Sequence, residues 1–186
     1  MFGKGSLGNI YYYGSETYKY INRVIDNKGE ILIVSPYVDG YYAEIICRKS
    51  RGRKFYIISS SVEDDVLRRL RGRSLQWLIA YLGLSAILLG FLLFISVSGI
   101  LLLIAPIPFI VGIIKTARNP PGVILKVPKK FVHAKMYISD GVAITGSTNL
   151  TYAGTHKNVE QISIIYNKAD IGRLKDQFWS MWESSR

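Results

Sequence analysis

Hydrophobic and polar residues follow one another in short blocks that predict strands alternating with helices. The block 9–13 predicts an aromatic-rich strand. Ser15 is a suitable N-cap for the helix after it, which extends to about Asn27 with its apolar residues at helical spacing. Two continuous apolar runs, 31–34 and 55–58, predict strands that are buried on both faces.

The rest of the pattern extends this alternation. Helices are expected over 41–49, 62–70 and 171–184, and strands over 123–127, 131–139, 142–145 and 162–166. The dipeptide Asp140-Gly141 between two of these strands is typical of a hairpin turn. Strands that alternate with helices predict an α/β fold in which a mixed β-sheet is flanked by helices.

One long segment does not fit a soluble domain. Residues 75–114 carry no charge, and this length is enough for two membrane crossings of about 20 residues each and too long for one. We expect spans over about 75–94 and 100–116. Pro106 and Pro108 lie in the second span and either kink it or make it re-entrant. A buried pair of core helices in a soluble protein is the alternative.

Positive residues flank this segment on both sides. They are Arg68, Arg69, Arg71 and Arg73 before it, and Lys115 and Arg118 after it. Cytoplasmic flanks of membrane spans are rich in Lys and Arg, and no apolar stretch typical of a secretory signal follows Lys4. We therefore expect a protein of the cell membrane with both termini in the cytoplasm. A transmembrane helical hairpin over 74–116 would interrupt one discontinuous domain, 1–73 and 117–186.

Composition agrees with this division. The chain of 186 residues is 49% hydrophobic, and its 24 Lys or Arg exceed its 13 Asp or Glu to give a formal net charge of +11. All of these charged residues lie outside 75–114. The apolar and aromatic content excludes intrinsic disorder, and the single cysteine excludes a disulfide framework.

Candidate chemistry gathers late in the chain. His133 and Lys135 are two positions apart on a predicted strand, so their side chains are expected on one face, and Ser147 and Asn149 follow the next strand. A lysine supplies charge, a hydroxyl and an amide donate directional hydrogen bonds, and an imidazole can attack phosphorus. This set suits a phosphate ester. No metal is implied, because carboxylates are not clustered at ligand spacing.

The spacing of these residues strongly resembles the signature of the phospholipase D superfamily, which is His-x-Lys, four residues, Asp, and then Gly-Ser-x-Asn. The matching residues are His133, Lys135, Asp140, Gly146, Ser147 and Asn149. The strand 31–34 that leads into Ser-Pro-Tyr and the later Glu160 are also similar to the family. The resemblance covers nearly all of the chain outside the apolar segment.

The resemblance implies a phosphodiesterase or phosphatidyltransferase that works through a phosphohistidine, without metal or cofactor. One histidine attacks the phosphodiester, and a second protonates the leaving oxygen. Because the chain has one copy of the motif, we expect a homodimer that brings two copies of His133 together. His156 is the internal alternative for the acid, although it lacks a lysine two residues on; otherwise it is an exposed loop histidine.

The resemblance also implies roles by position. His133 is expected to be nucleophile or acid, and Glu160 to orient its imidazole through the other ring nitrogen. The residues expected to bind phosphate oxygens are Lys135, Ser147 and Asn149. Asp140 and Gly146 are expected to be structural, with Asp140 accepting hydrogen bonds from backbone donors at the turn.

The spacing departs from the family in one respect. Five residues separate Asp140 from Gly146, whereas the family usually has six, and one missing residue reverses the face that later side chains occupy. A two-residue loop would place Lys135 opposite Gly146 and turn Ser147 to the other face. We predict instead a three-residue loop over 140–142, or an equivalent bulge, that pairs Lys135 with Ser147.

The motif does not choose between nucleic acid and phospholipid, since both contain the same linkage. Eight basic residues could line a groove for a nucleic acid: Arg48, Lys49, Arg51, Arg53, Lys54, Lys126, Lys129 and Lys130. Positive residues also hold a domain against anionic membrane lipids. The expected function is a membrane-anchored nuclease, because small single-motif members of the family are typically nucleases. The alternatives are a phospholipase D or a phosphatidyltransferase similar to cardiolipin synthase, and an inactive membrane scaffold.

Overall fold

The computed structural model describes residues 9–50, 52–70, 82–87 and 122–185. The chain divides into two compact units, Met1–Leu70 with Pro121–Arg186, and Arg71–Pro120. Residues 82–87 of the second unit are helical. Within the described ranges no helix is long and apolar enough to cross a membrane. The transmembrane hairpin predicted over 74–116 lies outside the described residues, apart from 82–87.

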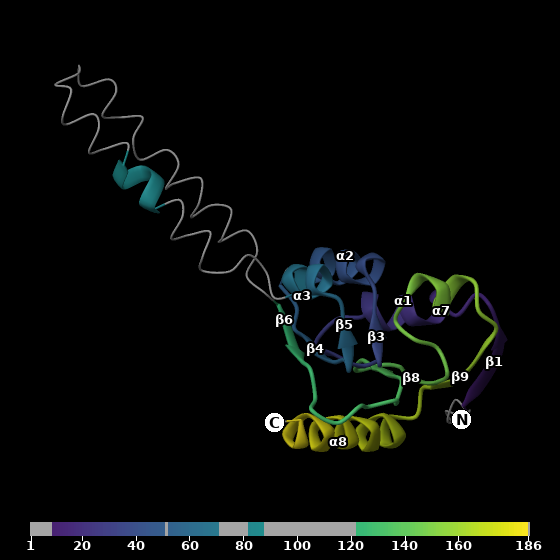
Figure 1. Ribbon diagram of the computed structural model, residues 1–186. Helices are drawn as coiled ribbons and strands as arrows, with labels where there is room; N and C mark the ends of the chain where they lie inside the picture. Colours follow the sequence, from purple (N-terminus) through teal and green to yellow (C-terminus); the bar gives the residue numbers. More distant parts are fainter. Residues whose placement is uncertain (1–8, 51, 71–81, 88–121, 186) are drawn as a thin grey trace. The chain divides into compact units, whose positions relative to one another are not determined.

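The first unit contains a seven-stranded mixed sheet with the order β1-β9-β8-β7-β2-β4-β6 among the described residues (Figure 1). β2, β4 and β6 run parallel, and the other neighbours are antiparallel. The strands are β1 (Ile10–Gly14), β2 (Ile31–Val34), β4 (Phe55–Ile58), β6 (Val123–Lys126), β7 (Met136–Ile138), β8 (Ala143–Gly146) and β9 (Glu160–Ile165). A small parallel pair joins β3 (Tyr37–Val38) to β5 (Ser61–Val62). The prediction of a mixed sheet is confirmed.

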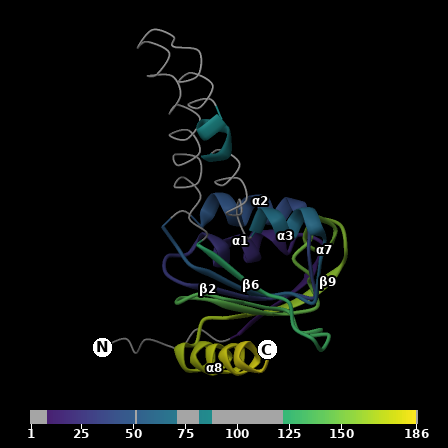
Figure 2. The ribbon, with the colours of Figure 1, turned by 60° about the vertical axis from the view of Figure 1, so that its left-hand side comes forward.

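Helices cover both faces of the sheet, as Figures 1 and 2 show. Those on one face are α1 (Tyr18–Asp26), α2 (Gly40–Lys49), α3 (Asp64–Leu70) and α7 (Tyr152–His156), and α8 (Lys168–Ser184) covers the other. Alternate residues of β2 therefore pack into two cores. Ile31 and Ile33 belong to the core under α1 and α2, whereas Leu32 and Val34 pack in the core that includes Phe178 of α8. A strand covered on both faces must be apolar at every position.

The predicted strands 31–34 and 55–58 are confirmed as β2 and β4. The first helix begins later than predicted, because Thr17 and not Ser15 is its N-cap. The predicted strand 131–139 is shorter, since β7 begins only at Met136, which pairs with Val34 at the end of β2. Beyond Val34 the neighbouring chain turns away through a proline, so the segment before Met136 has no strand partner on that side.

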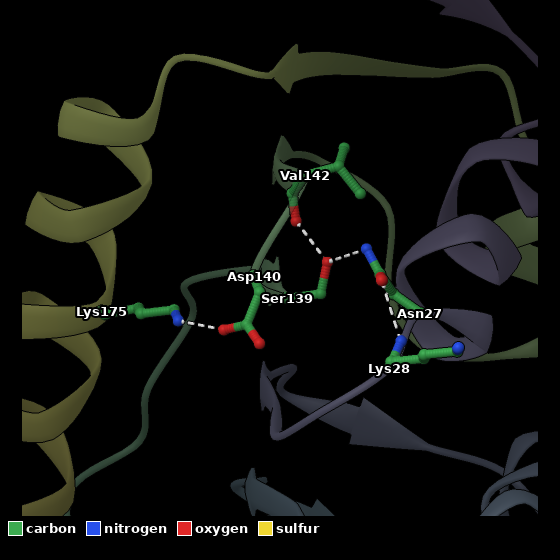
Figure 3. Close-up of polar contacts among 6 residues, drawn as sticks. All are labelled: Asn27, Lys28, Ser139, Asp140, Val142 and Lys175. Atoms are coloured by element: carbon green, nitrogen blue, oxygen red, sulfur yellow. Dashed lines mark hydrogen bonds and ion pairs between the residues drawn. The ribbon is translucent and has the colours of Figure 1, made fainter.

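The turn between β7 and β8 has two residues, because Ile138 pairs with Ala143 and the Ser139 amide donates to the Val142 carbonyl over 3.0 Å. The predicted three-residue loop is wrong. Figure 3 shows one reason: the Ser139 hydroxyl donates to that same carbonyl over 2.9 Å and accepts from the Asn27 side chain over 3.0 Å. These contacts hold the two strand ends together at Ser139.

Asp140 connects the same turn to the opposite face of the sheet. Its carboxylate forms an ion pair with Lys175 of α8 over 2.7 Å (Figure 3). The Asp140 carboxylate was expected to accept hydrogen bonds from backbone donors at the turn. Among the described residues it accepts none of these and bonds to Lys175 instead. With Asn27 at the end of α1 and Lys175 on α8, the turn is tied to helices on both faces.

The docking of α8 gives a test of stability. Phe178 is fully buried, so Phe178→Ala is expected to lower the free energy of unfolding by about 3–5 kcal/mol. Lys175→Ala breaks an ion pair that is partly open to solvent and is expected to cost at most about 1 kcal/mol. Chemical denaturation of the full chain, followed by tryptophan fluorescence, measures both. Equal losses would show that apolar burial is not what holds α8.

Candidate functional site

The candidate site lies at the carboxyl end of the parallel strands β2 and β4. β7 begins and β8 ends there, since Met136 pairs with both Val34 and Thr145. β9 also begins at this end with Glu160. Side chains from three strands that are neighbours in the sheet therefore meet where ligands bind in many open α/β sheets.

Lys135 lies directly against His133, just before β7. Its Nζ is 3.0 Å from Nε2 and 3.2 Å from Nδ1 of the imidazole, and it donates to the His133 carbonyl over 2.8 Å. The two ring nitrogens point in different directions, so an ammonium nearly equidistant from both lies against the ring and in line with neither. His133 is exposed, whereas Lys135 is only 7% exposed. The exposed imidazole thus lies next to a buried ammonium.

His133 and Lys135 were expected on a strand, and the structure brings them together without one. Ser60 supplies the missing support: its hydroxyl accepts from the Val132 amide over 2.7 Å and donates to the Val132 carbonyl over 3.1 Å. One side chain thus satisfies both backbone groups of the residue before His133. Sequence reasoning missed Ser60. The available signal was a run of three serines directly after a buried strand.

Glu160 and Ser147 form the second part of the site. The Ser147 hydroxyl donates to the Glu160 carboxylate and accepts from the Gln161 amide over 3.0 Å, and the Asn158 side chain donates to Glu160 over 3.4 Å. Among the described residues Glu160 has no hydrogen bond to His133 of the kind that was expected. The carboxylate acts instead on Lys135 through its charge.

Gly146 allows Ser147 to reach Glu160 in spite of the short turn. In the two-residue register, Lys135 would face Gly146 and Ser147 would point to the other face. After Gly146 the pairing with β9 is half retained: the Ser147 amide still donates to the Gln161 carbonyl over 3.0 Å, whereas the Gln161 amide donates to the Ser147 hydroxyl. A Cβ at position 146 would lie 2.2 Å from the Gln161 carbonyl oxygen, so this close approach requires glycine.

Asn149 contributes an unpaired polar group. Its Oδ1 is buried and has no hydrogen-bond partner among the described residues. A buried amide without a partner costs free energy unless something bonds to it. An atom of this kind is what a site for a polar ligand is expected to contain.

Two opposing effects act on the lysine of the site. Burial lowers the pKa of Lys135 below its usual value, and the charge of Glu160 raises it by a smaller amount. Across the described part of the chain, no three His, Cys, Asp or Glu side chains group closely enough to hold a metal ion.

His156 is not the exposed loop residue that was expected. It ends α7, a helix that the sequence analysis missed, and its ring stacks between Tyr18 and Tyr152 with centroid separations of 4.4 Å. Its Nδ1 lies 2.7 Å from the hydroxyl of Thr155. His156 thus packs in an aromatic cluster with Tyr18 and Tyr152 that does not include His133 among the described residues.

The seven described members of the set of eight basic residues do not line one groove. Arg48, Lys49, Arg53 and Lys54 lie where α2 ends and β4 begins, which is the amino end of the parallel strands and opposite the site. Arg53 donates to the backbone of Asn27 and Ile25, so its charge is used within the fold. At the carboxyl end Lys129 and Lys130 are exposed, and Lys126 bonds to α8. Arg51 lies outside the described residues.

The chain is similar to one family model and to several solved structures. Residues 114–182 match the family model described as "Cardiolipin synthase, PLD-like domain". No curated protein sequence matches the chain. Nuc from Salmonella typhimurium, a phospholipase D family member, is similar in structure, with a TM-score of 0.54 and 17% identity over 96% of this chain and 97% of Nuc.

Two further solved structures are similar. NucT from Helicobacter pylori has a TM-score of 0.53 and 17% identity over 95% of this chain and 96% of NucT. Phosphatidylserine synthase from Haemophilus influenzae Rd KW20 has a TM-score of 0.52 and 12% identity over 96% of this chain and 38% of its own. The chain thus spans nearly the full length of the first two and less than half of the third.

The charge of Glu160 predicts a shift in pH dependence. Glu160→Gln removes the charge that raises the pKa of Lys135 and leaves the burial that lowers it. A lower pKa means that the ammonium is lost at lower pH, so the basic limb of kcat/KM against pH should move to lower pH. A pH profile with a chromogenic phosphodiester measures this. Asn158→Ala retains the carboxylate and should leave the limb in place; an unmoved limb in Glu160→Gln would contradict the coupling.

Proposed function

We propose that the chain is a member of the phospholipase D superfamily that hydrolyses the phosphodiesters of nucleic acid through a phosphohistidine, without a metal, as a homodimer; the family-model match and the similar structures support this. The observation that carries the proposal is the buried ammonium of Lys135 against the exposed imidazole of His133. A cation in a partly desolvated position attracts a phosphate strongly. It would hold the phosphorus where the imidazole can attack.

The proposed reaction has two steps. A ring nitrogen of His133 forms a bond to phosphorus, and the bond from phosphorus to the leaving oxygen breaks as that oxygen takes a proton from the second histidine. Water then attacks the same phosphorus and gives a proton to the second histidine, while the bond to His133 breaks. The products are a phosphate monoester and an alcohol, and both histidines return to their starting states.

The second histidine is proposed to be His133 of a partner chain. Within one chain the other histidine is His156, whose ring is held between two tyrosines and has no contact with His133 among the described residues. Two-fold pairing of chains would place two copies of the site against each other. Each copy would then supply nucleophile or acid.

Nucleic acid is proposed ahead of phospholipid because the chain has one copy of the motif and spans nearly the full length of Nuc and NucT, but only 38% of phosphatidylserine synthase. Residues 71–121 follow α3 in the sequence and precede Gly122, whose carbonyl accepts from the Phe55 amide at the start of β4. The Arg69 carbonyl accepts from the Cys47 thiol near the end of α2. Both points lie at the amino end of the parallel strands, and His133 lies at the carboxyl end. The segments that hold His133 are thus separate, within the domain, from the two points where residues 71–121 join it.

The membrane anchor itself is proposed from the sequence. Two spans within 74–116, with the domain and both termini in the cytoplasm, follow from the apolar run and its positive flanks. Membrane lipids are then neighbours of the domain. Phospholipid is accordingly the second candidate substrate, supported by the description of the matched family model and by phosphatidylserine synthase among the similar structures.

Substrate assays with chelator separate these candidates. The full chain should cleave single-stranded nucleic acid in the presence of EDTA, and release no headgroup from phospholipid vesicles. His133→Ala should lower kcat at least about a thousandfold, since the nucleophile is lost. Quenching with labelled substrate should trap an acid-labile, base-stable phosphoprotein in the unaltered chain alone. Activity that disappears with EDTA would contradict the metal-free route.

A matched variant tests the role of the second histidine. His156→Phe retains the ring stack and removes the ring nitrogens, so kcat should change less than about threefold if the acid comes from a partner chain. A loss as large as that of His133→Ala would make His156 the acid.

Chain mixing tests the homodimer. Unaltered chains are co-expressed with His133→Ala chains. If a site needs two copies of His133, activity should be proportional to the square of the fraction of unaltered chains. Total nuclease activity at fixed total protein, across several ratios, is the measurement. A linear dependence on that fraction would mean that each chain works alone.

A further inference from the structure

Three aromatic rings form an open row that ends at the proposed nucleophile. The ring centroids of Tyr37 and Phe131 are 6.1 Å apart, and those of Phe131 and His133 are 6.2 Å apart with an interplanar angle of 27°. Phe131 is 57% exposed and Tyr37 is 44% exposed. Large apolar rings in this position lose the free energy that burial would provide. The row is therefore a surface to which a flat apolar partner can bind.

We propose that Phe131 and Tyr37 form a stacking subsite for nucleobases next to the scissile phosphate, which makes single-stranded nucleic acid the preferred substrate. The inference rests on the proposed nuclease activity and adds to it the strandedness of the substrate. It assigns Phe131 and Tyr37 as specificity residues outside the motif that carries the chemistry.

The two rings are held on supported backbone. Phe131 precedes Val132, whose amide and carbonyl both bond to Ser60. Tyr37 pairs with Ser61 in the small sheet, and the Tyr37 carbonyl accepts from the Ser35 hydroxyl over 2.8 Å. The serine run after β4 thus positions both rings as well as the segment that leads to His133. Stacking on pre-positioned rings requires little ordering when the substrate binds.

The second histidine of the chain shows what a closed aromatic cluster looks like. The ring of His156 is stacked at 4.4 Å on both Tyr18 and Tyr152, so these rings cover its two faces. The wider separations around Phe131 leave ring faces open to solvent. Both clusters contain one histidine, but the ring of His156 is stacked on both faces, whereas the ring of His133 has one aromatic neighbour among the described residues.

A nucleobase suits this row in position and in charge. When a phosphate lies at the His133 ring, the adjoining nucleoside is within reach of a ring 6.2 Å away. Every base has a flat face, and stacking on an aromatic side chain needs no particular sequence. Lys129 and Lys130 are exposed directly before Phe131 and can contact neighbouring phosphates. Base faces in a duplex are covered by their neighbours, so the subsite can bind single strands and not paired ones.

The test compares oligonucleotides with and without bases. Phe131→Leu and Tyr37→Leu should each raise KM for a single-stranded oligonucleotide about tenfold, and Phe131→Trp should retain the unaltered KM. On an abasic oligonucleotide of the same length, where no base can stack, the same substitutions should leave KM nearly unchanged. Tyr11→Leu is the matched control, because it removes a ring that is 72% exposed on β1, away from the row, and should leave KM unchanged.

Three outcomes would overturn the inference or its premise. Equal KM changes on normal and abasic strands, or no change on either, would show that the rings do not stack on bases. Weaker binding of the variants to anionic phosphatidylglycerol vesicles, with KM for single strands unchanged, would make the row a membrane contact. If the unaltered chain cleaves neither the normal nor the abasic oligonucleotide, the proposed function itself would be contradicted.

Discussion

The pairing of β2 with β7 ends at Val34 and Met136, and the arrangement of the site depends on where it ends. The residues just before Met136 lie outside the sheet, so their backbone must find other hydrogen-bond partners. Ser60 provides them at Val132. Because Lys135 is not fixed by strand geometry, its side chain can fold back onto the ring and carbonyl of His133. A longer β7 would hold these residues in the ladder.

Charge within the site is balanced by burial. A buried ammonium is costly because it gives up hydration, and the charge of Glu160 offsets part of that cost. Glu160 is itself buried and receives hydrogen bonds from Ser147 and Asn158. The motif serine thus stabilises a carboxylate, which in turn favours the charged form of the motif lysine. This chain of contacts explains how residues far apart in sequence affect the charge of Lys135.

Much of the fold and the proximity of Lys135 to His133 could be predicted from sequence, and the failures have a common physical cause. The strands 31–34 and 55–58 were found because a short continuous apolar run fits a strand covered on both faces. The length of the β7–β8 turn was predicted wrongly, because it depends on contacts of Ser139 with Asn27 and of Asp140 with Lys175. Those partners are 112 and 35 residues away in sequence. Local patterns carry no information about them, nor about the bond between Ser60 and Val132.

The domain joins residues 71–121 at the amino end of the parallel strands and holds the candidate site at their carboxyl end. This separation explains how one domain can contain a long apolar insertion. At the amino end, α3 and β6 adjoin residues 71–121, and β6 still pairs with β4 along its whole length. At the carboxyl end, the segments that follow β2, β4 and β8 and those that precede β7 and β9 hold the site. An insertion at the amino end changes none of those segments. The strand pairings that place His133, Ser147 and Glu160 therefore involve no residue of 71–121.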